Sequence, residues 1–217
     1  MTRVKICCMG SVEEAEIAVG LGASAVGLVS SMPSGPGVIA EPRIVEIAAT
    51  VPPPIATFLL TSLTDPGEIS AQQRRCRVNT IQLCDRLPEG AHAKLRSFLP
   101  GCSLVQVIHV SGEESVEEAF RYAGEVDALL LDSGNLTLPI KELGGTGRTH
   151  DWELSARIVQ EVPLPVFLAG GLDPSNVSDA IRTVRPFGVD VCSGVRTAGR
   201  LDPTKVRGFL EGVEGAT

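Results

Sequence analysis

The sequence lacks three features that mark common functional classes: a long apolar run, an excess of basic charge and paired cysteines. No stretch of about 18 uncharged apolar residues occurs, so we expect no membrane contact. The opening Met-Thr-Arg-Val-Lys-Ile-Cys-Cys lacks the apolar core of a secretory signal and is typical of a strand. The net charge of −7 argues against a nucleic-acid partner, which would need a basic patch.

The six cysteines are scattered along the chain. None belongs to a CxxC pair, and none has a histidine at ligand spacing, so the pattern predicts neither a zinc site nor a disulfide framework. Reduced thiols buried in strands are the simplest interpretation. The predicted compartment is therefore the cytoplasm.

Short apolar, β-branched runs alternate with helix-like segments at a spacing of about 27 residues, which is typical of βα units around a parallel sheet. Open doubly wound sheets usually have fewer strands than eight, and no GxGxxG follows the first run. The pattern predicts α/β class and a single (β/α)8 TIM barrel spanning residues 1–217. The predicted strands are 4–8, 25–30, 55–61, 80–84, 104–110, 128–133, 165–169 and 189–193.

Several predicted helices have clear start signals. Ser11 precedes Val-Glu-Glu, which indicates an N-cap followed by acidic residues in the first turn. Asp-Pro pairs at 65–66, 173–174 and 202–203 place proline at the first helical position. We therefore expect helices to begin at these four points.

Polar residues at the carboxyl ends of barrel strands are the first candidates for catalysis. Because side chains alternate along a strand, Lys5 and Cys7 are expected to point into the barrel, and Asp132 points the same way in strand 128–133. A thiol and a carboxylic acid facing each other across the mouth suit proton transfer. For Cys7 alone a structural role is the simpler interpretation, whereas Asp132 follows an apolar run and is the stronger candidate.

Three glycine-rich segments form a second group of candidates: 144–147, 169–171 and 193–194. The last two follow the seventh and eighth predicted strands, where backbone N–H groups bind phosphate in many barrels. An acidic protein needs such local donors to hold an anion. The predicted phosphate-binding residues are Gly145, Thr146, Gly147, Gly170, Gly171, Ser193 and Gly194.

In their order and spacing these motifs resemble the phosphoribosylanthranilate isomerase family of tryptophan biosynthesis. The resemblance runs nearly end to end, from Lys5-Ile6-Cys7 through Leu131-Asp132-Ser133 and the Gly-Gly-Thr-Gly of 144–147. It continues through Leu-Ala-Gly-Gly-Leu at 168–172 and ends in the highly specific stretch 185–195.

The resemblance implies an Amadori rearrangement of a phosphorylated aminoaldose, a small-molecule substrate. Asp132 would be the general acid that opens the ribose ring, and Cys7 the general base that removes the proton on the second sugar carbon. Asp190 would orient the reacting amine, with Lys5 and Arg196 as further substrate-binding candidates. The implied reaction uses no metal and no redox cofactor, and both a monomer and a homodimer are compatible with the sequence.

The chain departs from the family pattern at three positions. Cys8 stands where the family has glycine, and we expect it to face outward as a packing substitution. Pro36 replaces the arginine that binds the anthranilate carboxylate, a loss of about 1.5–3 kcal/mol. Arg196 replaces a glutamate, and our hypothesis is that it takes over the carboxylate, the alternative being a solvent-facing arginine.

Two other functional classes stay open. Pro36 and Arg196 favour a divergent isomerase or epimerase acting on another phosphorylated amino sugar or sugar. A non-catalytic barrel that binds a phosphorylated ligand is the third possibility, but binding alone requires no opposed acid and base.

Overall fold

The computed structural model describes residues 1–216, which form a closed barrel of eight parallel strands. The strands follow one another around the barrel in sequence order, and β8 pairs with β1 to close it. This confirms the predicted (β/α)8 class. The strands are β1 Arg3–Ile6, β2 Ala25–Val29, β3 Ala56–Thr61, β4 Thr80–Leu83, β5 Ser103–His109, β6 Ala128–Asp132, β7 Val166–Leu168 and β8 Gly188–Val191.

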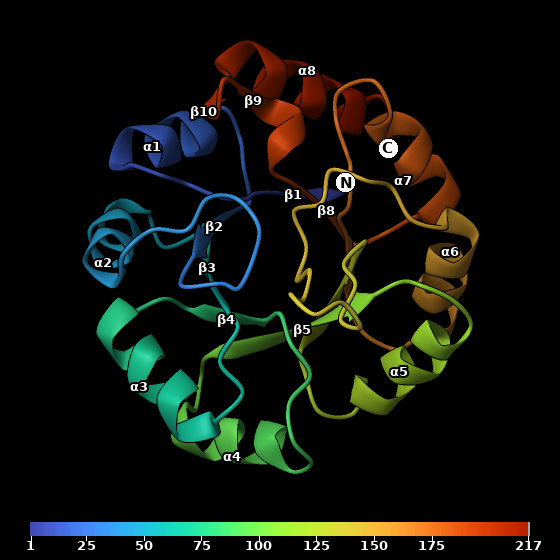
Figure 1. The fold of residues 1–217 in the computed structure, drawn as a ribbon. Coiled ribbons are helices and arrows are strands. Elements are labelled where there is room, and N and C mark those ends of the chain that lie inside the picture. The colour runs from blue at the N-terminus through green and yellow to red at the C-terminus, as the bar shows by residue number, and fades with distance from the viewer. Residues whose placement is uncertain (217) are drawn as a thin grey trace.

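In the described part of the chain, residues 1–216, eight helices surround the strands, and they form a ring around the barrel (Figure 1). After β8 the chain adds a short 3-10 turn, η1 (Ser193–Val195), and a small hairpin of β9 (Arg196–Thr197) and β10 (Arg200–Leu201). The described residues include no helix with the length and apolar character needed to cross a membrane. The helices are α1 Val12–Gly20, α2 Glu41–Thr50, α3 Pro66–Cys76, α4 Ala91–Phe98, α5 Glu114–Tyr122, α6 Trp152–Glu161, α7 Val177–Val184 and α8 Pro203–Glu214.

Three of the four predicted helix starts are confirmed. The Ser11 hydroxyl accepts the backbone N–H of Glu14 at the start of α1, and Asp65 and Asp202 cap α3 and α8 with proline in the first turn. The prediction at 173–174 is wrong, because α7 begins only at Val177.

Local hydrogen bonds explain the later start of α7. The Asp173 carboxylate accepts the backbone N–H and the hydroxyl of Ser175, and the Asn176 side chain accepts the N–H of Asp173. These bonds stabilise a turn between the strand and the helix, since short polar side chains compete with helical hydrogen bonding at such positions. Pro174 lies inside that turn.

Alternation along the strands separates two apolar layers. In β6, Leu129 and Leu131 join the large core between the barrel and its helices. Ala128 and Leu130 join a smaller cluster of buried residues that fills the barrel, as does Cys7 just after β1. Asp132 continues the inward-pointing series of β6, so its carboxyl group reaches the C-terminal mouth.

Candidate active site

A cavity of about 690 Å³, including space open to solvent, lies at the C-terminal mouth of the barrel. It is lined by strand ends and by two loops, residues 31–38 after β2 and residues 134–150 between β6 and α6. Of the predicted site residues, those that line it are Cys7, Asp132, Asp190, Gly145, Thr146, Gly147, Gly170, Gly171 and Ser193.

Asp132 ends β6 and is almost completely buried. Its Oδ1 atom accepts the backbone N–H of Ser133 at 2.7 Å. Burial raises the pKa of the Asp132 carboxyl group above its ordinary value, against the opposing effect of that hydrogen bond and of His109. A carboxyl group with a raised pKa holds its proton to a higher pH than usual, which suits it to act as an acid.

Cys7 follows β1 and reaches the cavity from the β1–β2 side. Its backbone N–H donates to the carbonyl of Val191 at 2.8 Å, which continues the β1–β8 pairing. A Cβ atom at Gly27 would lie only 2.6 Å from the Cys7 Sγ atom, so glycine leaves the space that the thiol occupies. Cys7 and Asp132 therefore meet at one cavity from β1 and β6, as the alternation predicts.

Lys5 lies below the cavity, not in its lining, and its side chain is completely buried. Its Nζ atom donates to Asp190 Oδ2 at 2.7 Å, because the register of β1 and β8 pairs these two residues. Burial opposes the charge of Lys5, but Asp190 outweighs it and raises the pKa of Lys5 above its ordinary value. Asp190 Oδ1 is buried and has no hydrogen-bond partner within residues 1–216, so a ligand N–H or O–H in the cavity could use it.

The predicted phosphate-binding segments lie together on the β6–β8 side of the cavity. The Thr146 hydroxyl is 2.7 Å from that of Ser133, which connects the β6–α6 loop to the end of β6. Gly171 has a φ of +62°, and a Cβ there would lie 2.7 Å from the backbone of Arg148. Gly194 lies just outside the lining, and a Cβ there would clash with the carbonyl oxygen of Leu172. Glycine thus allows three loops to pack side by side.

Cys8 faces the cavity, so the expectation that it points outward is wrong. β1 ends at Ile6, and Cys8 has a φ of 65°, which interrupts the alternation that the prediction assumed. This left-handed conformation favours glycine and costs a cysteine roughly 1–2 kcal/mol. The side chain contacts Gly37 in the β2–α2 loop and lies 2.7 Å, sulfur to sulfur, from Cys192.

Arg196 does not line the cavity, which counts against its predicted role as a carboxylate-binding residue. Its guanidinium group instead forms a bidentate ion pair with Glu14 of α1, at 3.0 and 3.1 Å. It also donates to the carbonyl oxygens of Cys7, Cys8 and Gly199. Arg196 therefore fastens the segment after β1 to the segment after β8. It is neither free for a ligand nor solvent-facing, with only 11% of its side chain exposed.

Four apolar side chains form an apolar end of the cavity lining: Val29, Met32, Leu60 and Leu143. Pro36 also lines the cavity and packs against Gly145 of the β6–α6 loop. Among the described residues no lysine or arginine lines this cavity. An aromatic ring would be well accommodated, whereas its carboxylate would have to rely on neutral donors.

Gln82 is a cavity residue that the sequence interpretation did not select. It points inward from β4, and its buried Oε1 atom has no partner in the described part of the chain. A polar side chain at an inward position of an apolar strand was the available signal.

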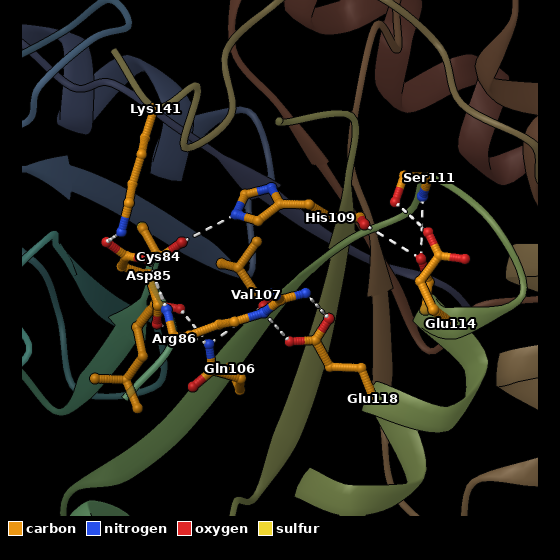
Figure 2. Close-up of polar contacts among 12 residues, drawn as sticks. Cys84, Asp85, Arg86, Gln106, Val107, His109, Ser111, Glu114, Glu118 and Lys141 are labelled. Carbon is orange, nitrogen blue, oxygen red and sulfur yellow. Dashed lines mark hydrogen bonds and ion pairs between the residues drawn. The ribbon is translucent and has the colours of Figure 1, made fainter. Parts of the chain in front are cut away.

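The β4–β5 rim carries further polar contacts (Figure 2). His109 pairs with Asp132 in the β5–β6 register, and its Nε2 atom is 3.0 Å from the carbonyl oxygen of Cys84. Lys141 of the β6–α6 loop forms an ion pair with Asp85 (Figure 2), with 2.6 Å between Nζ and Oδ2. The Ser34 hydroxyl donates to the Lys141 carbonyl, which connects the two loops over the cavity.

A closed eight-stranded barrel with a thiol and a carboxyl group at its C-terminal mouth has the architecture of a (β/α)8-barrel enzyme. Comparison with known proteins identifies the family. The model of the N-(5'-phosphoribosyl)anthranilate isomerase family matches residues 4–212, and the chain belongs to this family. In residues 1–216 we find no cluster of three or more histidine, cysteine or acidic side chains arranged to hold a metal ion.

Individual relatives cover almost the whole chain. The N-(5'-phosphoribosyl)anthranilate isomerase of Methanocella arvoryzae is 38% identical, with 98% of each chain covered. The phosphoribosylanthranilate isomerase structure from Thermotoga maritima has a TM-score of 0.85 at 30% identity, covering 99% of this chain and 100% of that one. Another isomerase structure, in complex with reduced 1-(o-carboxyphenylamino)-1-deoxyribulose 5-phosphate, has a TM-score of 0.82 at 29% identity, with 99% and 100% covered.

Proposed function

We propose that this chain catalyses the isomerisation of N-(5'-phosphoribosyl)anthranilate to 1-(2-carboxyphenylamino)-1-deoxyribulose 5-phosphate, a step of tryptophan biosynthesis. The observation that carries this proposal is that Cys7, Asp132 and Asp190 reach one cavity from β1, β6 and β8. Membership of the isomerase family and a structural relative in complex with a reduced form of this product support it. We place the reaction in the cytoplasm, where the six free cysteines would stay reduced.

Asp132 serves as the general acid in the proposed first step. Its raised pKa favours the protonated carboxyl group, and from this form it donates a proton to the ribose ring oxygen. The bond between that oxygen and the first sugar carbon breaks, and the nitrogen lone pair forms a protonated Schiff base. The carboxylate that remains on Asp132 is stabilised by the N–H of Ser133.

Cys7 acts as the general base in the second step. Its thiolate removes the proton from the second sugar carbon, and the electron pair released forms the enolamine double bond and neutralises the Schiff base. Tautomerisation of the enolamine then gives the ketone. The Gly27 position keeps space for the sulfur at the cavity wall.

Asp190 and the glycine segments hold the substrate in this proposal. The unpartnered Oδ1 of Asp190 accepts the anilino N–H, while Lys5 holds the other oxygen in place from below. The phosphate lies at the β6–β8 side, where η1 starts directly after β8 and the Ser193 hydroxyl faces the cavity. The apolar end formed by Val29, Met32, Leu60 and Leu143 takes the aromatic ring.

A second candidate substrate is another phosphorylated amino sugar without an aryl carboxylate. The observation that favours it is that, among the described residues, no lysine or arginine lines the cavity. Pro36 stands in the lining, and Arg196 is paired with Glu14 outside it. The acid, the base and the phosphate segments would serve that substrate equally.

Loss of phosphoribosylanthranilate fluorescence tests the proposal directly. The purified protein should consume this compound, and Cys7→Ala and Asp132→Asn should each reduce kcat by at least about a hundredfold, the usual size of a general acid–base contribution. Rescue of a tryptophan auxotroph that lacks the isomerase separates this substrate from the alternative. Full rates in both variants would overturn the assignment of the acid and the base.

A further inference from the structure

A pair of thiols at the cavity rim has no part in the proposed reaction. Cys8 follows β1 and Cys192 follows β8, and their Sγ atoms lie 2.7 Å apart. The two strands are neighbours, with Ile6 paired to Val191, so the two cysteines project from adjacent strand ends. The contact is therefore built into the barrel and does not depend on a mobile surface segment.

The two sulfurs differ in their surroundings. Cys8 is buried, while Cys192 is partly exposed and lines the cavity, where a small solute can reach it. The hydrogen bond between the thiols and the nearby charge of Arg196 lower the pKa of Cys192. Hydrogen bonds to Cys192 and Cys7, together with burial, raise the pKa of Cys8. The accessible thiol is thus the one with more thiolate, which is the reactive form.

The geometry is close to that of a covalent bond. A disulfide has a sulfur–sulfur distance near 2.05 Å, so the two atoms need to approach by only about 0.7 Å. The left-handed backbone of Cys8 turns its side chain away from the direction that strand alternation would give it and toward Cys192. We propose that Cys8 and Cys192 form a reversible disulfide when the protein reacts with a hydroperoxide, which makes this pair an oxidation site at the active-site mouth.

The reaction balances in two steps. With hydrogen peroxide, the Cys192 thiolate attacks one oxygen, the O–O bond breaks, and the other oxygen leaves as hydroxide and takes a proton to become water; an organic hydroperoxide would release an alcohol instead. Cys192 becomes a sulfenic acid in this step. The Cys8 thiol then attacks that sulfur and expels the second oxygen as water. The two thiols lose two hydrogens and two electrons in total, and the peroxide gains them. A thiol reductant such as dithiothreitol reverses the bond by exchange.

Peptide mapping after treatment with hydrogen peroxide tests the proposal. Trypsin gives one peptide of residues 6–43, which contains Cys7 and Cys8, and another of residues 183–196, which contains Cys192. The expected result is a dithiothreitol-sensitive link between these two peptides. Cys7→Ser should keep the link, and Cys102→Ser, at a remote cysteine, should also keep it.

Cys8→Gly should abolish the link without a folding penalty, because glycine is at ease in the left-handed conformation. In that variant Cys192 should stop at the sulfenic acid and become labelled by dimedone. A link that persists in Cys8→Gly, or oxidation of Cys192 in the unmodified protein without any linked peptide, would overturn the proposal. The readout does not involve isomerase activity, so a negative result here leaves the proposed function untouched, and the reverse also holds.

Discussion

Replacement of Arg196 by alanine should destabilise the protein while changing substrate affinity little. The variant removes both hydrogen bonds to Glu14 and those to the carbonyl oxygens of Cys7 and Cys8. Glu14 has 17% of its side chain exposed and would be left as a largely buried charge. Breaking a buried ion pair costs about 3–5 kcal/mol.

The lower end of that range applies, because Glu14 keeps two other partners. The backbone N–H groups of Gly10 and Leu201 each donate to its carboxylate at 2.9 Å. A loss of about 3 kcal/mol corresponds to a fall in Tm of about 6–12 °C for a chain of this length. Thermal denaturation followed by circular dichroism measures this shift.

A double-mutant cycle with Glu14→Gln separates the ion pair from other effects. Removing both charges together should cost less than the sum of the single losses, with a coupling of about 1–3 kcal/mol. The opposite result would refute the reasoning: a Tm unchanged in Arg196→Ala, accompanied by a raised KM for phosphoribosylanthranilate, would mean that the arginine binds the substrate carboxylate after all.

Three further variants test individual features of the mouth. Asp132→Asn should abolish isomerase activity, and in the unmodified protein kcat/KM should fall as the pH rises through the raised pKa of Asp132, because the acid loses its proton. Because the pKa of Asp132 is higher in the folded state than in the unfolded state, the free energy of unfolding falls as the pH rises through that pKa. Asp132→Asn lacks this penalty, so urea titrations at neutral pH should find it more stable than the unmodified protein. Equal stability would contradict the burial argument. Gly194→Ala should raise KM more than it lowers kcat, because its Cβ would push η1 away from the carbonyl of Leu172. An unchanged KM would show that this loop takes no part in phosphate binding. Cys8→Gly should unfold at a temperature about 2–4 °C above that of Cys8→Ala, since both lose the sulfur but alanine retains roughly 1 kcal/mol of net strain. Identical melting would show that the left-handed conformation costs nothing.

Strand periodicity was enough to predict the barrel and the direction of its inward side chains. Asp132 is reached by counting along a regular strand, and the structure places it at the cavity as predicted. Counting along the strand gives the wrong direction for Cys8, because β1 ends two residues earlier and the positive φ of Cys8 redirects the chain. Alternation holds only while the backbone stays extended.

Arg196 shows a different limit of sequence interpretation. Its partner Glu14 lies 182 residues away, and only the closure of the barrel between β8 and β1 brings the two together. A cation close to an expected anion site was a reasonable candidate for ligand binding, but an internal carboxylate competes for it. Gln82 could have been found as a polar residue at an inward position of β4, but only the structure shows that its Oε1 atom lacks a partner.

The Lys5–Asp190 pair has a consequence for the charge balance of the reaction. Because Lys5 is completely buried against Asp190, their two charges cancel at the barrel floor before any substrate arrives. In the proposed sequence Asp132 gives up a proton and Cys7 gains one, so the protein side of the cavity carries the same total charge after proton abstraction as before ring opening. The catalytic groups can thus complete both transfers without drawing a proton from bulk water between them.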